Sequence, residues 1–131
     1  MSESVTAPRV VVLADDLIWQ TRLVGTLRAI GADAARARGD AGLEDTLAGV
    51  DAVVVDLTAR NYDPIAAIEQ AAAAGRRVLA VGQHDDAQQR KRALAAGAER
   101  VYAYRKLFED GPATLAAWLG PDALGIQEGY G

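Results

Sequence analysis

The chain has 131 residues, 50% of them hydrophobic, with a formal net charge of −4 and no cysteine. This length suits one domain, the lack of cysteine excludes disulfides and thiolate-bound metal centres, and the negative charge argues against general nucleic-acid binding. The apolar runs are far shorter than a membrane span and the N-terminus lacks the pattern of a secretory signal, so we expect a cytoplasmic protein.

Short apolar runs alternate with helical patterns along the chain, which is typical of βα units around a parallel sheet. The run over 9–14 is a continuous Val and Leu stretch and predicts a strand buried on both faces. A helix capped by Asp16 follows and ends at Gly31. A strand over 32–37 and a short helix over 43–47 come next.

The second half of the chain repeats the same alternation. The expected elements are, in order, a strand over 51–56, a helix from Pro64 to 75, a strand over 77–81, a helix capped by Asp85 or Asp86 and running to 96, a strand over 101–104 and a helix from Asp110 to 119. The sequence therefore predicts an α/β fold with a doubly wound, five-stranded parallel sheet. We expect the domain to cover 9–119, preceded by an extension over 1–8 and followed by a flexible tail over 120–131.

Carboxylates follow two of the predicted strands. Asp15 and Asp16 come after the first strand and Asp56 ends the third. In open parallel sheets, ligands bind outside the carboxyl ends of the strands, where these side chains are expected to meet. Gathered carboxylates favour either a raised pKa or a bound hard cation such as Mg²⁺. Asp16 also has a structural interpretation, because it can simply cap the first helix.

A series of motifs in order resembles the receiver domains of response regulators (CheY-like). They are Val-Val-Val-Leu-Ala before Asp15-Asp16, Leu23-x-x-x-Leu27-x-x-x-Gly31, Asp-Ala-Val-Val-Val before Asp56, Arg-Val-Leu-Ala-Val before Gly82, and Ala95-Ala96-Gly97-Ala98. The resemblance covers about residues 8–119 and implies a flavodoxin-like sheet of order 2-1-3-4-5 with helices on both faces. It also implies that Asp15 and Asp16, with Asp56, bind Mg²⁺, and that Asp56 accepts a phosphoryl group from a histidine kinase.

The chain departs from this family at the partners of the acidic site. Gly82 stands where receivers carry a Ser or Thr hydroxyl, and ungapped alignment puts Tyr104 where they carry a Lys. Lys106 matches that Lys only if two residues are inserted, and Arg60 or Arg105 are alternative cations. Phosphoryl transfer needs its oxygens neutralised, so the loss of both groups removes much of that stabilisation.

The resemblance and its departures lead to one preferred function and two alternatives. We expect a stand-alone receiver-like signalling module, not an enzyme, that binds a sensor kinase or a downstream effector, with phosphorylation of Asp56 impaired or absent. The partner surface implied is the fourth helix, fifth strand and fifth helix; no nucleic-acid or membrane partner is expected, and homodimerisation stays open. The alternatives are a conventional phosphorylatable response regulator, and a small α/β ligand-binding domain or enzyme. A Gly-rich phosphate loop, which the latter would favour, is absent after the first strand.

Overall fold

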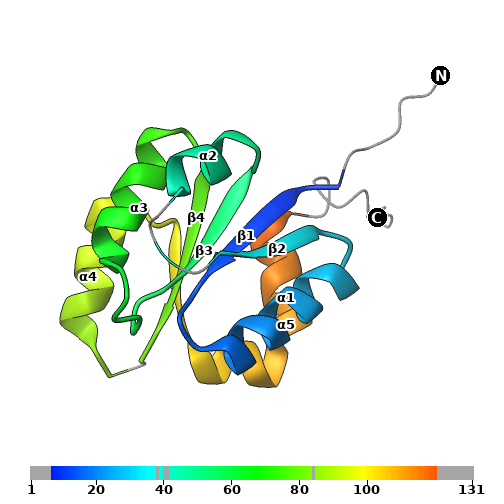
Figure 1. The fold of residues 1–131 in the computed structure, drawn as a ribbon. Coiled ribbons are helices and arrows are strands. Elements are labelled where there is room, and N and C mark those ends of the chain that lie inside the picture. The colour runs from blue at the N-terminus through cyan, green and yellow to red at the C-terminus, as the bar shows by residue number, and fades with distance from the viewer. Residues whose placement is uncertain (1–6, 38, 40–41, 84, 121–131) are drawn as a thin grey trace.

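A computed structural model describes residues 7–37, 39, 42–83 and 85–120 of the chain. Five parallel strands form one sheet of order β2-β1-β3-β4-β5, as predicted (Figure 1). The strands are β1 (Arg9–Leu13), β2 (Asp33–Ala37), β3 (Ala52–Asp56), β4 (Arg77–Gly82) and β5 (Arg100–Ala103). The doubly wound α/β fold inferred from the alternating pattern is therefore confirmed.

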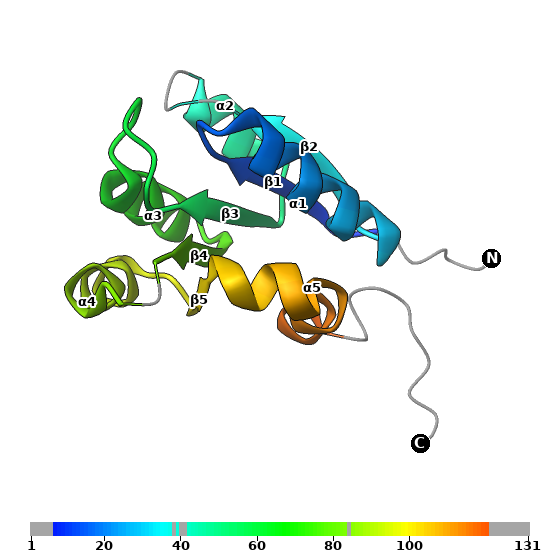
Figure 2. The same cartoon turned by 90° about the horizontal axis from the view of Figure 1, so that it is seen from below.

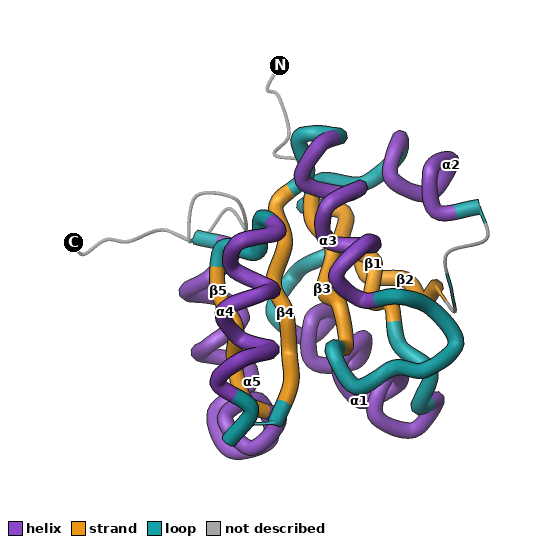
Figure 3. Tube along the Cα trace, turned by 90° about the vertical axis from the view of Figure 1, so that its left-hand side faces the viewer, coloured by secondary structure: helices purple, strands orange, loops and turns teal. Residues whose placement is uncertain are grey.

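Helices cover both faces of this sheet. They are α1 (Leu17–Ala29), α2 (Leu43–Ala48), α3 (Pro64–Ala73), α4 (Ala87–Ala96) and α5 (Tyr104–Leu119). Helices α1 and α5 pack together on one face, while α2, α3 and α4 lie on the other, as the view from below shows (Figure 2). The trace seen from the side places α3 and α4 in front of the strands (Figure 3).

The buried strands supply a core to each face because successive side chains point to opposite sides. In β1, Val10 and Val12 pack with α1 and α5, while Val11 and Leu13 pack with α2 and α3. The same alternation holds in β3 and β4, so two apolar clusters flank one sheet. This is why the central strands read as continuous runs of Val and Leu.

Three aspartates cap helices in the structure. Asp16 accepts the backbone N–H of Trp19 at the start of α1, and Asp86 accepts that of Gln89 at the start of α4. Asp63 accepts the backbone N–H groups of Ile65 and Ala66, and Pro64 occupies the first turn of α3. Each cap satisfies backbone donors that would otherwise lack a partner.

The last helix differs from the prediction. The sequence placed Tyr104 on the fifth strand and started the helix at Asp110, but α5 begins at Tyr104, and Asp110 is a non-helical residue inside it (φ −143°, ψ 36°). Asp110 and Pro112 resemble a helix start, which explains the prediction. The preceding turn is helical because Leu107 is buried in the cluster shared with α1, a contact invisible to local patterns.

Several expectations lie outside the described residues or at their limits. The predicted extension over 1–8 and tail over 120–131 fall almost wholly there. In the part of the chain that the structure describes, no helix has the length and apolar character needed to cross a bilayer.

Candidate functional site

The carboxyl ends of the strands bring the predicted site residues to one edge of the sheet. Leu13 of β1 pairs with Val55 of β3, so Asp15 lies beyond the end of β1 beside Asp56. On the other side of β3, Asp56 pairs with Val81, next to Gly82. The sheet topology therefore places Asp15, Asp16, Asp56 and Gly82 at the edge where the sequence predicted them.

Asp56 is buried and held by hydrogen bonds. Its side chain is only 3% exposed. Its Oδ1 accepts the backbone N–H of Thr58 at 2.9 Å and the Thr58 hydroxyl at 2.8 Å, and it also accepts the hydroxyl of Tyr104. Three donors thus converge on one oxygen of this carboxylate, and none of them carries a charge.

Tyr104 occupies the place that ungapped alignment assigned to the receiver lysine. It is the first residue of α5, directly after β5, and its hydroxyl oxygen lies 2.6 Å from that of Thr58. Burial, followed by the hydrogen bond to Asp56, raises the pKa of Tyr104 well above its ordinary value, so it stays a neutral donor at neutral pH. Its ring meets Trp19 edge to face, with centroids 5.0 Å apart and an interplanar angle of 89°.

The role of Thr58 was not predicted from the sequence. A threonine two positions beyond an aspartate can bond back to that carboxylate through both its backbone and its hydroxyl. The Asp-Leu-Thr spacing of residues 56–58 was the available signal. The structure shows that this local turn supplies two of the three donors to Asp56.

Asp15 and Asp16 have different partners. Asp15 Oδ2 accepts the backbone N–H groups of Arg60 and Asn61 at 2.6 and 3.0 Å, which ties the loop after β3 to the end of β1. Asp15 Oδ1 is buried without a hydrogen-bond partner among the described residues. Asp16 Oδ1 accepts the N–H of Trp19 at 3.0 Å as the cap of α1.

Tyr62 is a second tyrosine at this edge that the sequence analysis did not single out. Its buried hydroxyl lies 2.7 Å from the carbonyl oxygen of Leu13 and 2.9 Å from that of Asp56, so it joins the ends of β1 and β3. Burial raises the pKa of Tyr62, and the nearby Asp56 and Asp15 carboxylates raise it further. Nothing in the local sequence distinguishes this tyrosine from an ordinary loop residue.

The cations considered as replacements for the receiver lysine lie elsewhere. Lys106 Nζ is 3.7 Å from Asp110 on the half-exposed surface of α5 and makes no ion pair with Asp56. Arg105 pairs with Glu109 at 3.0 Å and is largely exposed. Arg60 meets the site through its backbone N–H rather than its guanidinium. Gly82 supplies no hydroxyl, and an added Cβ would lie 3.1 Å from Leu57 Cδ1.

The three aspartates share an edge but do not form a three-carboxylate cation site. In the ranges described, no group of three or more His, Asp or Glu side chains is placed to hold a metal ion. One oxygen of each carboxylate already has a partner: Asp16 caps a helix, Asp15 anchors a loop and Asp56 accepts three donors. Asp16 and Asp56 line one pocket, together with Tyr104. The Mg²⁺ site expected at Asp15, Asp16 and Asp56 stays a prediction.

Sequence comparisons give no relatives. No protein-family model matches the chain, and neither does any curated protein sequence. The similarities that were found are similarities of fold.

Solved structures of similar fold are response regulators. A response regulator of Burkholderia pseudomallei with a phosphorylated aspartic acid, calcium ion and citrate is 19% identical over 88% of this chain and 68% of that one (TM-score 0.72). A two-component response regulator of Clostridium difficile is 14% identical over 86% and 95% (TM-score 0.75). NtrX of Brucella abortus is 14% identical over 86% of this chain, which spans 28% of NtrX (TM-score 0.69).

These likenesses agree with the strand order of the sheet. The chain has the flavodoxin-like fold of response-regulator receiver domains.

Proposed function

We propose that this chain is a receiver-like signal-transduction module that acts by binding a partner protein, with Asp56 held in hydrogen bonds instead of being phosphorylated. The observation that carries the proposal is the convergence of Tyr104 and Thr58 on Asp56 Oδ1. A carboxylate that is 3% exposed and accepts three donors is a poor nucleophile, because burial limits access to it and the donors draw negative charge from it.

The charge balance of the site supports the same function. A transferred phosphoryl group spreads negative charge over three oxygens, which cations or metal ions neutralise. Here the residue facing Asp56 is a tyrosine, which is uncharged at neutral pH, and Lys106 pairs with Asp110. Gly82 provides no hydroxyl in place of the Ser or Thr of receivers. Among the described residues, the site offers hydrogen bonds but no positive charge, which suits a resting carboxylate better than an acyl phosphate.

The partner surface expected from the resemblance is the face formed by α4, β5 and α5. Leu94 of α4 is 46% exposed, and the exposed Lys91 lies one helical turn before it. An apolar side chain beside a cation suits a partner with an acidic rim around an apolar contact. We propose a cytoplasmic sensor kinase or effector as this partner, with homodimerisation as the alternative use of the face.

Phosphorylation tests the proposal. The full chain is incubated with Mg²⁺ and acetyl phosphate, and its intact mass is measured. We expect no added phosphoryl group on the natural chain, and measurable phosphorylation of Asp56 in Tyr104→Lys, because that change supplies the missing cation and removes one of the three donors to Oδ1. Lys106→Ala is the matched control and should behave like the natural chain. A stable acyl phosphate on Asp56 of the natural chain, lost in Lys106→Ala, would restore the conventional response-regulator function.

A further inference from the structure

A cavity lies between α1 and α5, beside the acidic pocket. It has a volume of about 80 Å³ and opens to solvent. Most of its lining residues have apolar side chains, among them Trp19 and Leu23 from α1, and Leu107 and Phe108 from α5. Phe108 is 48% exposed, which is unusual for so large an apolar ring. Apolar concave walls of this kind are typical of small-molecule sites.

One cation stands at this cavity. Arg22 is its single charged lining residue, and its guanidinium lies over the Phe108 ring, 4.6 Å from the centroid. Within the described ranges Arg22 forms no ion pair, in contrast to Arg77 and Arg105. The Thr26 hydroxyl, the other polar group of the wall, donates to the Arg22 carbonyl at 3.1 Å. A planar cation held against an aromatic wall is complementary to an aromatic anion.

The cavity also adjoins the Asp56 network. Trp19 and Phe108 line both this cavity and the acidic pocket that contains Asp56. The Trp19 ring meets the Tyr104 ring, whose hydroxyl bonds Asp56. Helix α5 is interrupted at Asp110, between the lining residues Phe108 and Pro112. A molecule that contacts Trp19 is therefore one side chain away from the hydrogen bonds that hold Asp56.

We propose that the cavity binds a small aromatic carboxylate of one or two fused rings. The ring packs against Trp19 and Phe108, and the carboxylate pairs with the Arg22 guanidinium. The cavity opens to solvent, so the molecule need not be fully enclosed, and the unpaired cation sets the sign of its charge. The proposal rests on the cavity alone and does not require Asp56 to be phosphorylated or unphosphorylated.

The probe is 2-naphthoate, titrated into the isotope-labelled full chain and followed by NMR of the backbone and of the two indole N–H groups. We expect saturable shifts confined to α1, α5 and the Trp19 indole, with Trp118 unmoved because it lies at the other end of α5. The uncharged 2-naphthalenemethanol should bind the same residues more weakly. An absence of saturable shifts up to about 5 mM, or shifts centred elsewhere, would overturn the proposal.

Variants separate the charge from the cavity. Arg22→Gln should weaken 2-naphthoate binding about fivefold and leave 2-naphthalenemethanol unaffected, as expected for one partly exposed ion pair. Arg28→Gln is the matched control: it removes the same charge from the same helix outside the cavity wall and should change neither affinity. Thr26→Leu, which fills the cavity, should abolish binding of both while the spectrum stays that of a folded chain. Equal effects of Arg22→Gln and Arg28→Gln on 2-naphthoate binding would contradict the proposed site. Full binding to a folded Thr26→Leu variant would contradict it too. In either case the cavity would be better explained as a contact for an apolar side chain of a protein partner.

Discussion

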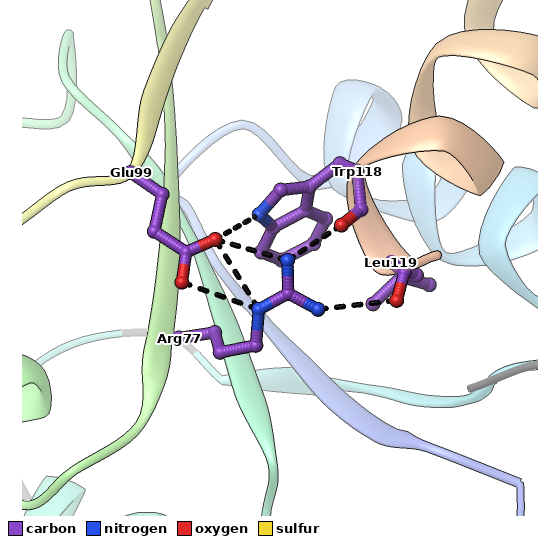
Figure 4. Close-up of polar contacts among 4 residues, drawn as sticks. All are labelled: Arg77, Glu99, Trp118 and Leu119. Carbon is purple, nitrogen blue, oxygen red and sulfur yellow. Dashed lines mark hydrogen bonds and ion pairs between the residues drawn. The ribbon is translucent and has the colours of Figure 1, made fainter. Parts of the chain in front are cut away.

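The two ends of the sheet use polar side chains in opposite ways. At the amino end, Arg77 of β4 donates to both carboxylate oxygens of Glu99 at 3.0 to 3.2 Å and to the last carbonyls of α5, those of Trp118 and Leu119, at 2.6 and 3.1 Å (Figure 4). The Trp118 indole N–H completes the cluster with a bond to Glu99. The hydrogen bonds from Arg77 hold the pKa of Glu99 below its usual value. Opposite charges are paired, and every guanidinium nitrogen has an acceptor.

At the carboxyl end, like charges gather without a cation among them. Asp15 and Asp56 are held by backbone N–H groups and neutral hydroxyls, and Asp15 Oδ1 is left buried without a partner in the described structure. Such an arrangement costs stability, whereas the Arg77 cluster supplies it. Polar side chains at both ends of the sheet are therefore not equivalent: the paired charges of Arg77 and Glu99 stabilise the fold, whereas the unpaired carboxylates of Asp15 and Asp56 mark the candidate site.

Alkaline pH should expose this difference most strongly. The pKa values of Tyr62 and Tyr104 are both raised, so above about pH 10, the ordinary tyrosine value, the unfolded chain loses protons that the folded chain keeps. The contribution of these raised pKa values to the stability of the fold is therefore fully present below about pH 10. Above that pH the free energy of unfolding falls by up to about 1.4 kcal/mol per pH unit for each tyrosine.

Urea unfolding from about pH 9 to about pH 11 measures this fall. Tyr62→Phe and Tyr104→Phe should each reduce the slope, and the double variant should reduce it further. Arg77→Ala, at the other end of the sheet, should leave the slope unchanged. An unchanged slope in the double tyrosine variant would show that other groups cause the alkaline loss.

Removing the centre of the amino-end cluster should have the next largest effect. Arg77→Ala breaks the bonds to Glu99 and to two α5 carbonyls, together with the stacking on Trp118 at 5.3 Å. Because the pair is about 40% exposed, we expect a loss of about 2 kcal/mol in the free energy of unfolding. Arg100→Ala removes a neighbouring exposed charge and serves as control. A loss equal to that of the control would mean that the cluster does not hold α5.

Tyr104→Phe should have a smaller effect on stability at neutral pH. It removes one donor from Asp56 but keeps the ring against Trp19, and the two donors of Thr58 remain. We expect a loss of about 1 kcal/mol, measured by urea unfolding, with Tyr102→Phe of β5 as the control. A gain of stability would show that Tyr104 strains Asp56 instead of satisfying it.

Lys106→Ala should have the smallest effect. The Lys106–Asp110 pair is half exposed and lies on one helix, so its removal should change the free energy of unfolding by less than about 0.5 kcal/mol. Thermal and urea unfolding measure the change. A loss above about 1 kcal/mol would place Lys106 in the acidic site after all and remove the contrast between the two ends.

The sequence by itself determined the fold and the location of the acidic residues. The Val-rich runs of β1, β3 and β4 are buried on both faces, which only a parallel sheet covered by helices allows. Local chemistry placed the caps Asp16, Asp63 and Asp86, and the strand ends placed Asp15 and Asp56 at one edge. These features depend on neighbours in the chain and on the periodicity of side chains.

Only the tertiary structure decided what surrounds those aspartates. Tyr104 reaches Asp56 across 48 residues, and Tyr62 joins Leu13 from 49 residues away, so neither contact leaves a local pattern. The start of α5 at Tyr104 follows from the burial of Leu107 against α1, which overrides the helix-start signal at Asp110. Hydrogen bonds and packing between distant segments depend on how the helices lie on the sheet, and this is why the partners of the acidic site emerged only in three dimensions.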